Sequence, residues 1–243
     1  MKSKSNIEWT DSTWNPVTGC TKISIGCRNC YAERLTYRLK AMGVPAYKNG
    51  FKVTIHPESL HAPLNTKKRK MIFVNSMSDF FHEDVPDSFI HQAIDVMRDA
   101  DWHIFQILTK RSARLKEFSK KISWPDNVWL GVTVESNELI YKMEDLKCSG
   151  AKTKFLSLEP LLTPMENLDL TGIDWVIVGG ESGPGSRPIK ESWVLDIKGQ
   201  CELFNVPFFF KQWGGVNKKK AGRLLLDKTW DEIPEPLINA ATI

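Results

Sequence analysis

Short apolar runs alternate with helical patterns along the chain from about residue 70 onward. Six of these runs, rich in Val, Ile, Phe or Trp, predict β-strands at residues 71–75, 103–108, 128–134, 154–158, 175–178 and 207–211. Most are apolar on both faces, which is typical of parallel strands that are covered on both sides. A further strand is expected around residues 7–14, ahead of the six.

Apolar residues at helical spacing fill the intervals between the strands. They predict a helix at 88–100 with Pro86 in its first turn, one capped by Ser112, one ending near Gly150 and one capped by Ser192. Another helix is expected at residues 31–40. Because strand and helix alternate so many times, the pattern indicates right-handed βαβ units and an α/β fold, a partial (β/α) TIM-like barrel.

The length of 243 residues suits a single domain of this kind, and no linker-like stretch interrupts it. Within residues 1–243 we expect four parts. Residues 1–40 hold a cysteine loop and the first helix, and 41–70 form an irregular insertion. Residues 71–213 hold the repeated β/α units, and 214–243 form a C-terminal tail.

The composition places the chain among globular proteins of the cytoplasm. With 42% hydrophobic and 26% charged residues it is neither disordered nor a simple repeat. No apolar run approaches the roughly 18 residues of a membrane helix, and no secretory signal precedes the first strand. The net charge of +4 is a weak bias towards anionic partners. The basic runs 67–70 and 218–220 are either phosphate contacts or solvated surface.

Three of the five cysteines, Cys20, Cys27 and Cys30, lie within eleven residues in the spacing C-x6-C-x2-C. An odd cysteine count without an export signal argues against a disulfide framework. Three thiolates can hold three irons of a [4Fe–4S] cluster and leave the fourth iron open. A structural zinc needs a fourth protein ligand, which would have to come from a distant cysteine or a histidine. Spacing alone favours the cluster and leaves zinc open.

Polar residues follow the apolar runs at the point where each predicted strand ends. They are Ser76, Ser78 and Asp79; Thr109, Lys110 and Arg111; Thr133 and Glu135; Ser157 and Glu159; Glu181 and Ser182; and Lys211 and Gln212. Ligands of parallel α/β folds bind at the carboxyl ends of the strands. We therefore expect a convergent polar mouth at this edge of the sheet, although any one residue could serve only in a turn.

A three-cysteine loop leading into a parallel (β/α) chain resembles the radical S-adenosylmethionine (SAM) enzymes. The chain is similar over nearly its whole length to a phage- and prophage-associated three-cysteine-motif family, related to spore photoproduct lyase-like radical enzymes. The resemblance is carried by WNPVTGC at 14–20, SMSDF at 76–80, LTKR at 108–111, WLGVTVE at 129–135, SLEPLL at 157–162, VGGESG at 178–183 and FKQWG at 210–214. The usual first cysteine gap is C-x3-C, and an aromatic residue usually stands where this chain has Asn29.

The resemblance implies a radical SAM type of partial barrel with a [4Fe–4S] cluster on Cys20, Cys27 and Cys30, and S-adenosyl-L-methionine as cofactor. It implies that Ser76, Met77, Ser78 and Asp79 bind the methionine amino group, and that Thr109 and Lys110 approach the carboxylate. By the same analogy Thr133, Glu135 and Ser157 hold the ribose, Gly179 and Gly180 lie close to the adenine, and Tyr31, Glu159 and Glu181 handle protons or hydrogen atoms.

The activity implied is reductive cleavage of SAM to a 5′-deoxyadenosyl radical, which acts on an unidentified substrate, with nucleic acid or a nucleotide as first candidate. The implied partners are an external flavodoxin- or ferredoxin-like one-electron donor and a second phage-encoded protein, in the host cytoplasm if the chain is itself phage-encoded. Two alternatives remain. One is a zinc-stabilised, non-catalytic nucleic-acid-binding protein. The other is a (β/α)-barrel hydrolase with a structural cysteine loop.

Overall fold

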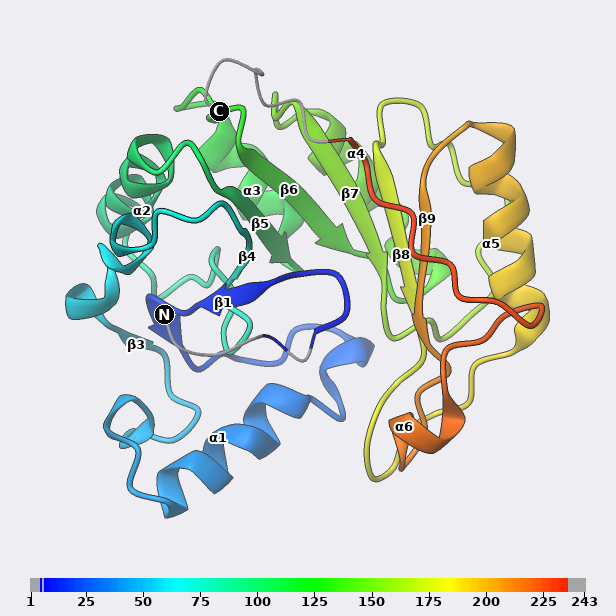
Figure 1. The fold of residues 1–243 in the computed structure, drawn as a ribbon, viewed down its shortest axis with the longest axis horizontal. Coiled ribbons are helices and arrows are strands. Elements are labelled where there is room, and N and C mark those ends of the chain that lie inside the picture. The colour runs from blue at the N-terminus through cyan, green and yellow to red at the C-terminus, as the bar shows by residue number, and fades with distance from the viewer. Residues whose placement is uncertain (1–4, 6, 236–243) are drawn as a thin grey trace.

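A curled sheet of seven parallel strands forms the centre of the computed structural model, which describes residues 5 and 7–235 (Figure 1). Its spatial order follows the chain: β1 (Ser12–Trp14), β4 (Met71–Val74), β5 (Ile104–Thr109), β6 (Val128–Thr133), β7 (Thr153–Leu158), β8 (Trp175–Gly179) and β9 (Phe208–Gln212). The sheet is a half-barrel, which confirms the predicted α/β partial barrel. The six predicted strands are all present, and the strand expected around residues 7–14 is limited to Ser12–Trp14.

Four helices cover the convex face of the sheet (Figure 1): α2 (Asp87–Asp99), α3 (Ser112–Ser119), α4 (Tyr141–Lys147) and α5 (Glu191–Leu203). Two others, α1 (Tyr31–Ala41) and the short α6 (Lys218–Ala221), lie at the carboxyl ends of the strands. Strands β7 and β8 are joined without a helix. Their connection instead buries Leu161, Met165 and Leu168 in the core outside the sheet. In the described part of the chain, no helix is long and apolar enough to cross a membrane.

The predicted helix starts were wrong by one or two residues. Ser112 is the first residue of α3 rather than its cap, because its hydroxyl donates to Asp145 of α4 at 2.7 Å. Ser192 lies inside α5, which begins at Glu191 after Lys190. Pro86 precedes α2 instead of lying in its first turn. At Ser112 a contact between helices replaces the local cap that the sequence indicates.

Residues 41–70 are largely irregular, with three short 3-10 helices, η2 (Pro45–Tyr47), η3 (Pro57–Ser59) and η4 (Ala62–Asn65). They also contain β3 (Thr54–Ile55), which pairs antiparallel with β2 (Val17–Thr18) in a ribbon that the sequence did not reveal. This ribbon holds the start of the cysteine loop. A Cβ atom on Gly19 would lie 2.3 Å from the Lys52 carbonyl oxygen, and the Cys20 amide donates to the Phe51 carbonyl at 3.1 Å.

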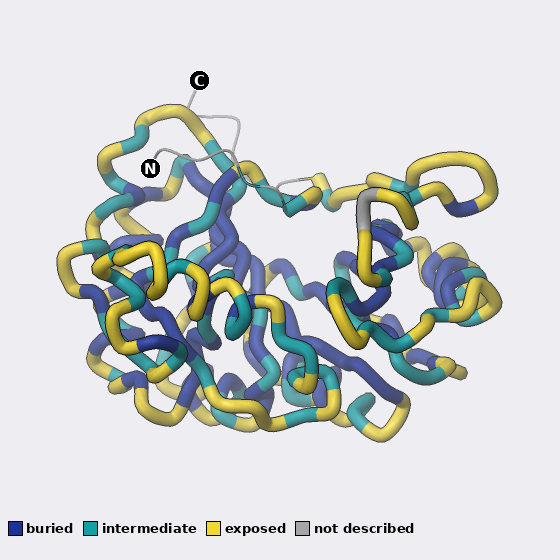
Figure 2. Tube along the Cα trace, turned by 90° about the horizontal axis from the view of Figure 1, so that it is seen from below, coloured by how far each residue is buried: buried dark blue, intermediate teal, exposed yellow. Residues whose placement is uncertain are grey.

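An aromatic cluster fills the concave side of the half-barrel towards the amino ends of the strands. We call it the inner cluster; its members are Trp9, Phe73, Ile104, Trp129, Phe155, Trp175, Ile177 and Phe209. Along β7, Phe155 belongs to this cluster, and Ser157 and Glu159 follow on the same side of the strand because side chains alternate. The inner cluster is therefore the floor beneath the polar strand ends. Figure 2 shows the buried strand segments surrounded by exposed loops.

Candidate functional site

A cavity of about 380 Å³ opens at the carboxyl ends of the strands, above the inner cluster. The sequence-predicted residues that line it are Cys20, Cys27, Cys30, Tyr31, Ser76, Ser78, Asp79, Thr109, Lys110, Thr133, Ser157, Glu159, Gly180 and Glu181. Arg111, Ser182, Lys211 and Gln212 line it as well. The convergence expected from the strand ends therefore occurs around one cavity.

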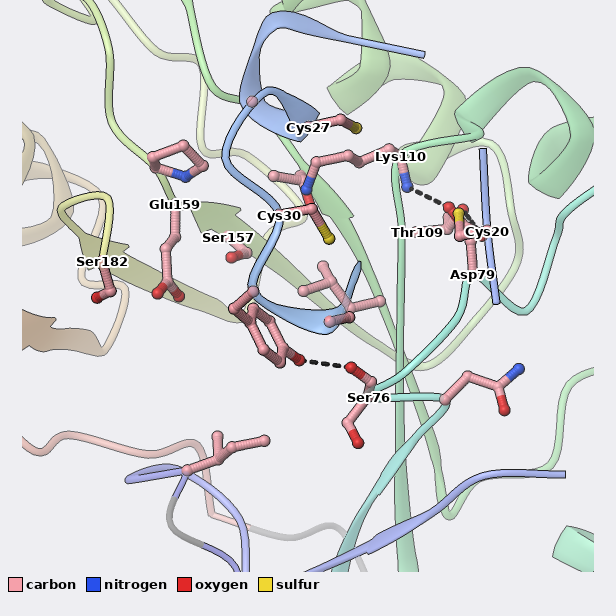
Figure 3. A pocket seen from close by; sticks show the side chains of 18 of the residues that line it. Cys20, Cys27, Cys30, Ser76, Asp79, Thr109, Lys110, Ser157, Glu159 and Ser182 are labelled. Carbon is pink, nitrogen blue, oxygen red and sulfur yellow. Dashed lines mark hydrogen bonds between the residues drawn. The ribbon is translucent and has the colours of Figure 1, made fainter. Parts of the chain in front are cut away.

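The three cysteines come from one loop, which we call the cysteine loop (residues 20–30), and all three are half-buried. Cys20 follows β2, Cys27 ends the short 3-10 helix η1 (Ile25–Cys27), and Cys30 directly precedes α1. Figure 3 shows the Cys30 side chain pointing into the cavity, between Glu159 on one side and Asp79 on the other. The loop thus brings three thiols to the wall of the same cavity.

Arg111 links Cys20 to the end of β5. Its guanidinium donates to Cys20 Sγ at 3.5 Å, to Asp79 at 3.2 Å and to Glu83 at 2.8 Å. Burial, together with the nearby Asp79 carboxylate, raises the pKa of the Cys20 thiol to about 11, although Arg111 acts in the opposite direction. The cavity wall at Cys20 therefore contains the buried Arg111–Asp79 pair, which the exposed Glu83 extends to the surface.

Asp79 is already occupied by groups of its own chain. It accepts hydrogen bonds from the Thr109 hydroxyl at 2.6 Å and the Lys110 amide at 3.1 Å, besides the one from Arg111. The Phe81 amide donates to it as well, at 3.0 Å. With both oxygens engaged, Asp79 holds the ends of β4 and β5 together, which is a different task from the ammonium binding that the resemblance implies.

Glu135 lies beneath the cysteine loop rather than in the cavity wall. It is fully buried, it pairs with Lys142 at 3.3 Å, and it accepts a hydrogen bond from the Ser24 hydroxyl. A Cβ atom on Gly26 would lie 2.5 Å from its Cγ atom. The ribose contact expected of Glu135 is therefore replaced by support of the loop.

Glu181 ties the cysteine loop to the far side of the sheet. Its carboxylate accepts from the Arg187 guanidinium and backbone amide and from Asn29 at 2.9 Å. Burial opposes its ionisation, but the hydrogen bonds from Arg187 and Asn29 prevail and lower the pKa of Glu181 to about 2. Glu181 is thus an ionised anchor, which does not suit the proton-handling role suggested for it.

Glu159 faces Lys211 across the end of the sheet. Lys211 Nζ donates to both carboxylate oxygens, at 2.7 and 2.9 Å, and Gln212 Nε2 approaches one of them at 3.3 Å. Tyr31 donates its hydroxyl to the carbonyl of Ser76, which Figure 3 labels, at 2.5 Å. Both side chains line the cavity while they are held by neighbours.

Three predicted cofactor contacts lie elsewhere or serve packing. Met77 and Gly179 are not among the residues that line the cavity. Gly180 does line it, but a Cβ atom there would lie 2.1 Å from the Trp213 carbonyl oxygen. At Gly180 the close backbone approach is therefore made by Trp213, directly after β9.

Arg111 was expected in the polar mouth without a role of its own, and Asn29 and Arg187 were not expected in the site. Arg111 stands in the strand-end run that pointed to Thr109 and Lys110, so its position carried a signal. Asn29 carried no signal, because its partner Glu181 lies 152 residues away in the chain. Arg187 lies only six residues from Glu181, but it follows no predicted strand.

Comparison with known proteins adds a family and a likeness of fold. A model of the family described as "Protein of unknown function (DUF5131)" matches residues 4–234. Two solved structures are similar at a TM-score of 0.43 and 11% identity. One is a double mutant of spore photoproduct lyase with bound AdoMet and dinucleoside spore photoproduct, where the match covers 77% of this chain and 60% of that chain. The other is the lyase complexed with dinucleoside spore photoproduct, with 76% and 59% covered.

The chain thus spans about 60% of the length of the lyase structures that it matches. No curated protein matches it. The phage association expected from the motifs stays a prediction.

Proposed function

We propose a function from the site itself, because the chain belongs to DUF5131, a family described only as protein of unknown function. The function is that of a radical SAM enzyme with a [4Fe–4S] cluster on Cys20, Cys27 and Cys30. One observation carries the proposal. Three half-buried cysteines of a single loop line the same cavity as the polar ends of a parallel half-barrel. Such a cavity is where parallel α/β folds place their ligands.

The residues present fit the cluster. Three cysteines can hold three irons of a four-iron cluster and leave one iron for an outside ligand. The cysteine loop supplies three thiols, one short of the four protein ligands that a structural zinc takes. A cluster with one open iron needs only these three, so the loop favours the cluster over the structural zinc.

The cavity also fits a ligand of the size of SAM. Its volume of about 380 Å³ lies within the roughly 300–1,000 Å³ of small-molecule sites. Polar side chains from both ends of the sheet line it, among them Asn75 directly after β4 and Gln212 of β9, so a ligand with polar groups suits it.

Several side chains of this chain would orient the ligands. Thr109 and Lys110, beside the cysteine loop, would face the methionine part, and Thr133 and Ser157 the ribose. When bound, the cluster and SAM would supply radical chemistry, the abstraction of a hydrogen atom from a substrate. The chain itself orients the ligands and excludes water, and an external one-electron donor provides the reducing equivalent.

The hydrolase alternative finds less support. A hydrolase of this fold needs a carboxylate or histidine free to take a proton near neutral pH. Glu181 is held ionised by Arg187 and Asn29, and Glu159 is paired with Lys211. The cysteine loop would also have no role in hydrolysis, although its three thiols lie in the cavity wall.

The test is anaerobic purification with iron and sulfide analysis of the parent, Cys27→Ala and Cys148→Ala. Cys148 is exposed and lies outside the cavity, so it is the matched control. We expect about four irons and four sulfides in the parent and in Cys148→Ala, and their loss in Cys27→Ala. The reduced parent should then form 5′-deoxyadenosine from SAM. One zinc per chain, with no iron after anaerobic reconstitution, would refute the proposal.

A further inference from the structure

Positive charge is concentrated in one segment of the chain, which we call the basic cap (residues 15–56). It contains seven Lys and Arg residues and a single Glu, a net charge of +6. The whole chain carries +4, so the remaining residues carry −2. The single acidic residue, Glu33, pairs with Lys22 at 2.7 Å. Five other cations of the cap are exposed: Arg28, Arg38, Lys40, Lys48 and Lys52.

The basic cap lies directly beside the cavity. It includes the cysteine loop, and helix α1 crosses the edge at which the strands end (Figure 1). Tyr31, the first residue of α1, lines the cavity. Arg34, one turn further, donates to the Ser182 carbonyl at 2.8 Å, on the opposite rim. A molecule bound along the outer side of α1 would therefore continue into the cavity.

The same surface exposes apolar and aromatic side chains among its cations. Tyr31 and Leu35 of α1, and Met42 directly after it, are 50%, 38% and 66% exposed, and the helical period places Arg38 in the same row. Tyr37 on the neighbouring row is 57% exposed, and Ile23 and Ile25 of the cysteine loop are about half exposed. The surface thus alternates positive charge with side chains that can pack on flat rings.

We infer that the basic cap binds single-stranded nucleic acid and leads it to the cavity. Phosphates match the uncompensated cations, and unpaired bases offer the faces on which Tyr, Leu and Ile side chains can pack. A duplex would hide those faces. A protein partner is favoured less, because protein interfaces are depleted in lysine, whereas the cap exposes Lys40, Lys48 and Lys52. The inference names the substrate class for the proposed function and rests on it for the reaction, but not for the binding.

The chain offers its own control for charge. The exposed residues Lys67, Lys68 and Arg69 directly precede β4, and the Lys70 amide donates to His103, which precedes β5. This run therefore lies at the amino ends of the strands, away from the cavity. Residues 67–69 carry three positive charges, as many as the three cations changed in the cap, but they lie at the other end of the strands.

The experiment measures binding of a fluorescent single-stranded oligodeoxynucleotide, about 12 nucleotides long, across a range of salt concentrations. The variants are Arg38→Gln/Lys40→Gln/Lys48→Gln in the cap and Lys67→Gln/Lys68→Gln/Arg69→Gln at the amino edge, each in the full chain and checked for an unchanged unfolding midpoint. We expect the cap variant to bind at least about tenfold more weakly. Its log–log salt slope should be shallower by about 2, since each phosphate contact to a single strand contributes about 0.7. The amino-edge variant should bind like the parent.

Equal weakening in both variants, or none in the cap variant, would overturn the inference. So would equal competition by polyglutamate of the same charge, because that result would show a surface that recognises negative charge alone. The outcome is separable from that of the proposed function, since 5′-deoxyadenosine formation is measured without an oligonucleotide. A parent protein that stays without iron after anaerobic reconstitution, yet still binds the oligonucleotide, would refute the radical mechanism while supporting the binding surface.

Discussion

Gly26 sets how closely the cysteine loop approaches the sheet. The loop passes over the fully buried Glu135, whose side chain is fixed by Lys142 and Ser24. Any side chain at residue 26 has to displace either the loop or this buried pair, since a Cβ atom would lie 2.5 Å from Glu135. The positions of Cys27 and Cys30 therefore depend on a residue that binds nothing itself.

We expect Gly26→Ala to lower the free energy of unfolding by about 1–3 kcal/mol, the usual cost of overpacking, and to reduce the iron retained after anaerobic reconstitution. Gly199→Ala is the control, because residue 199 lies in α5 and a Cβ atom there meets nothing within 4 Å. This control should be neutral or gain up to about 1 kcal/mol. Urea unfolding measures the stability of both variants, and iron analysis after reconstitution measures the cluster that each retains. A Gly26→Ala protein as stable as Gly199→Ala would contradict the close contact.

Glu181 predicts how stability depends on pH. Its pKa is about 2 in the folded chain against an ordinary value of 4.5, so the ionised form stabilises the fold. That contribution is complete above about pH 5 and is lost as the pH falls through 4.5 towards 2. We expect Glu181→Gln to reduce the acid-induced loss of stability by about 2 kcal/mol over this interval.

The measurement is urea unfolding of the parent and Glu181→Gln at pH 7, 5 and 3. The difference between the two proteins should be constant from pH 7 to 5 and should narrow at pH 3. A variant that loses as much stability between pH 5 and pH 3 as the parent would show that Arg187 and Asn29 do not hold Glu181 ionised.

Strands β6 and β7 show how two elements share the space inside the half-barrel. Gly131 pairs with Phe155 across the two strands, and the Phe155 ring lies where a Cβ atom on Gly131 would be, at 2.5 Å. Phe155 also packs against Trp175, with ring centroids 5.8 Å apart. The absent side chain of one strand therefore makes room for the large side chain of the next.

This pairing predicts a strong coupling between the two positions. Gly131→Ala alone should cost about 1–3 kcal/mol, since the buried Phe155 ring would have to move. In the double variant with Phe155→Leu, the second change should cost less than it does alone, with a coupling of about 0.5–3 kcal/mol. Urea unfolding of the two single variants and the double variant completes the cycle. Additive losses would contradict the packing.

Pattern alone predicted the longer elements and missed the short ones. Six strands were visible because runs such as 128–134 are apolar on both faces. The two-residue strands β2 and β3 leave no periodicity to detect, although they fix the position of Cys20. The alternation of strands and helices also broke between β7 and β8. There an irregular segment covers the core with Leu161 and Met165, as a helix would.

On the scale of the whole molecule, the segment before β1 fills the half-barrel from its open side. The Trp9 ring packs on Phe73 at 4.7 Å between centroids and on Trp175 at 6.1 Å. The segment is tied to β4 by the Met71 amide, which donates to Asp11 at 2.8 Å. Trp9 and Phe73 both line the bottom of the cavity, so this segment also sets its depth.

We expect Trp9→Ala to cost about 3–5 kcal/mol in urea unfolding, as for other buried aromatic truncations. Trp9→Phe should cost far less, since Trp9 Nε1 has no hydrogen-bond partner within the described chain and Phe retains most of the packing. Trp193→Ala is the control, because Trp193 is half-buried on α5 and measures the stability lost when a tryptophan outside the half-barrel is truncated. A Trp9→Ala protein as stable as Trp193→Ala would mean that the segment is not needed to close the fold.

The position of positive charge is also set by the fold of the whole molecule. The two basic segments 15–56 and 67–70 are close in the chain, yet the second leads into the amino end of β4 and the first covers the carboxyl ends. Both segments carry an excess of positive charge in the sequence. The direction of the strands separates them, and only the basic cap borders the cavity.

The sequence by itself determined the spacing of Cys20, Cys27 and Cys30, the parallel α/β fold and the polar strand ends, because these follow from residue types and periods within short windows. Only the tertiary structure decided which polar residues face the cavity. Ser157 lines it, whereas Glu135 is buried beneath the cysteine loop. Their roles depend on partners far away in the chain, as with Asn29 and Glu181. Burial and hydrogen bonding between such distant groups appear only when the strands assemble.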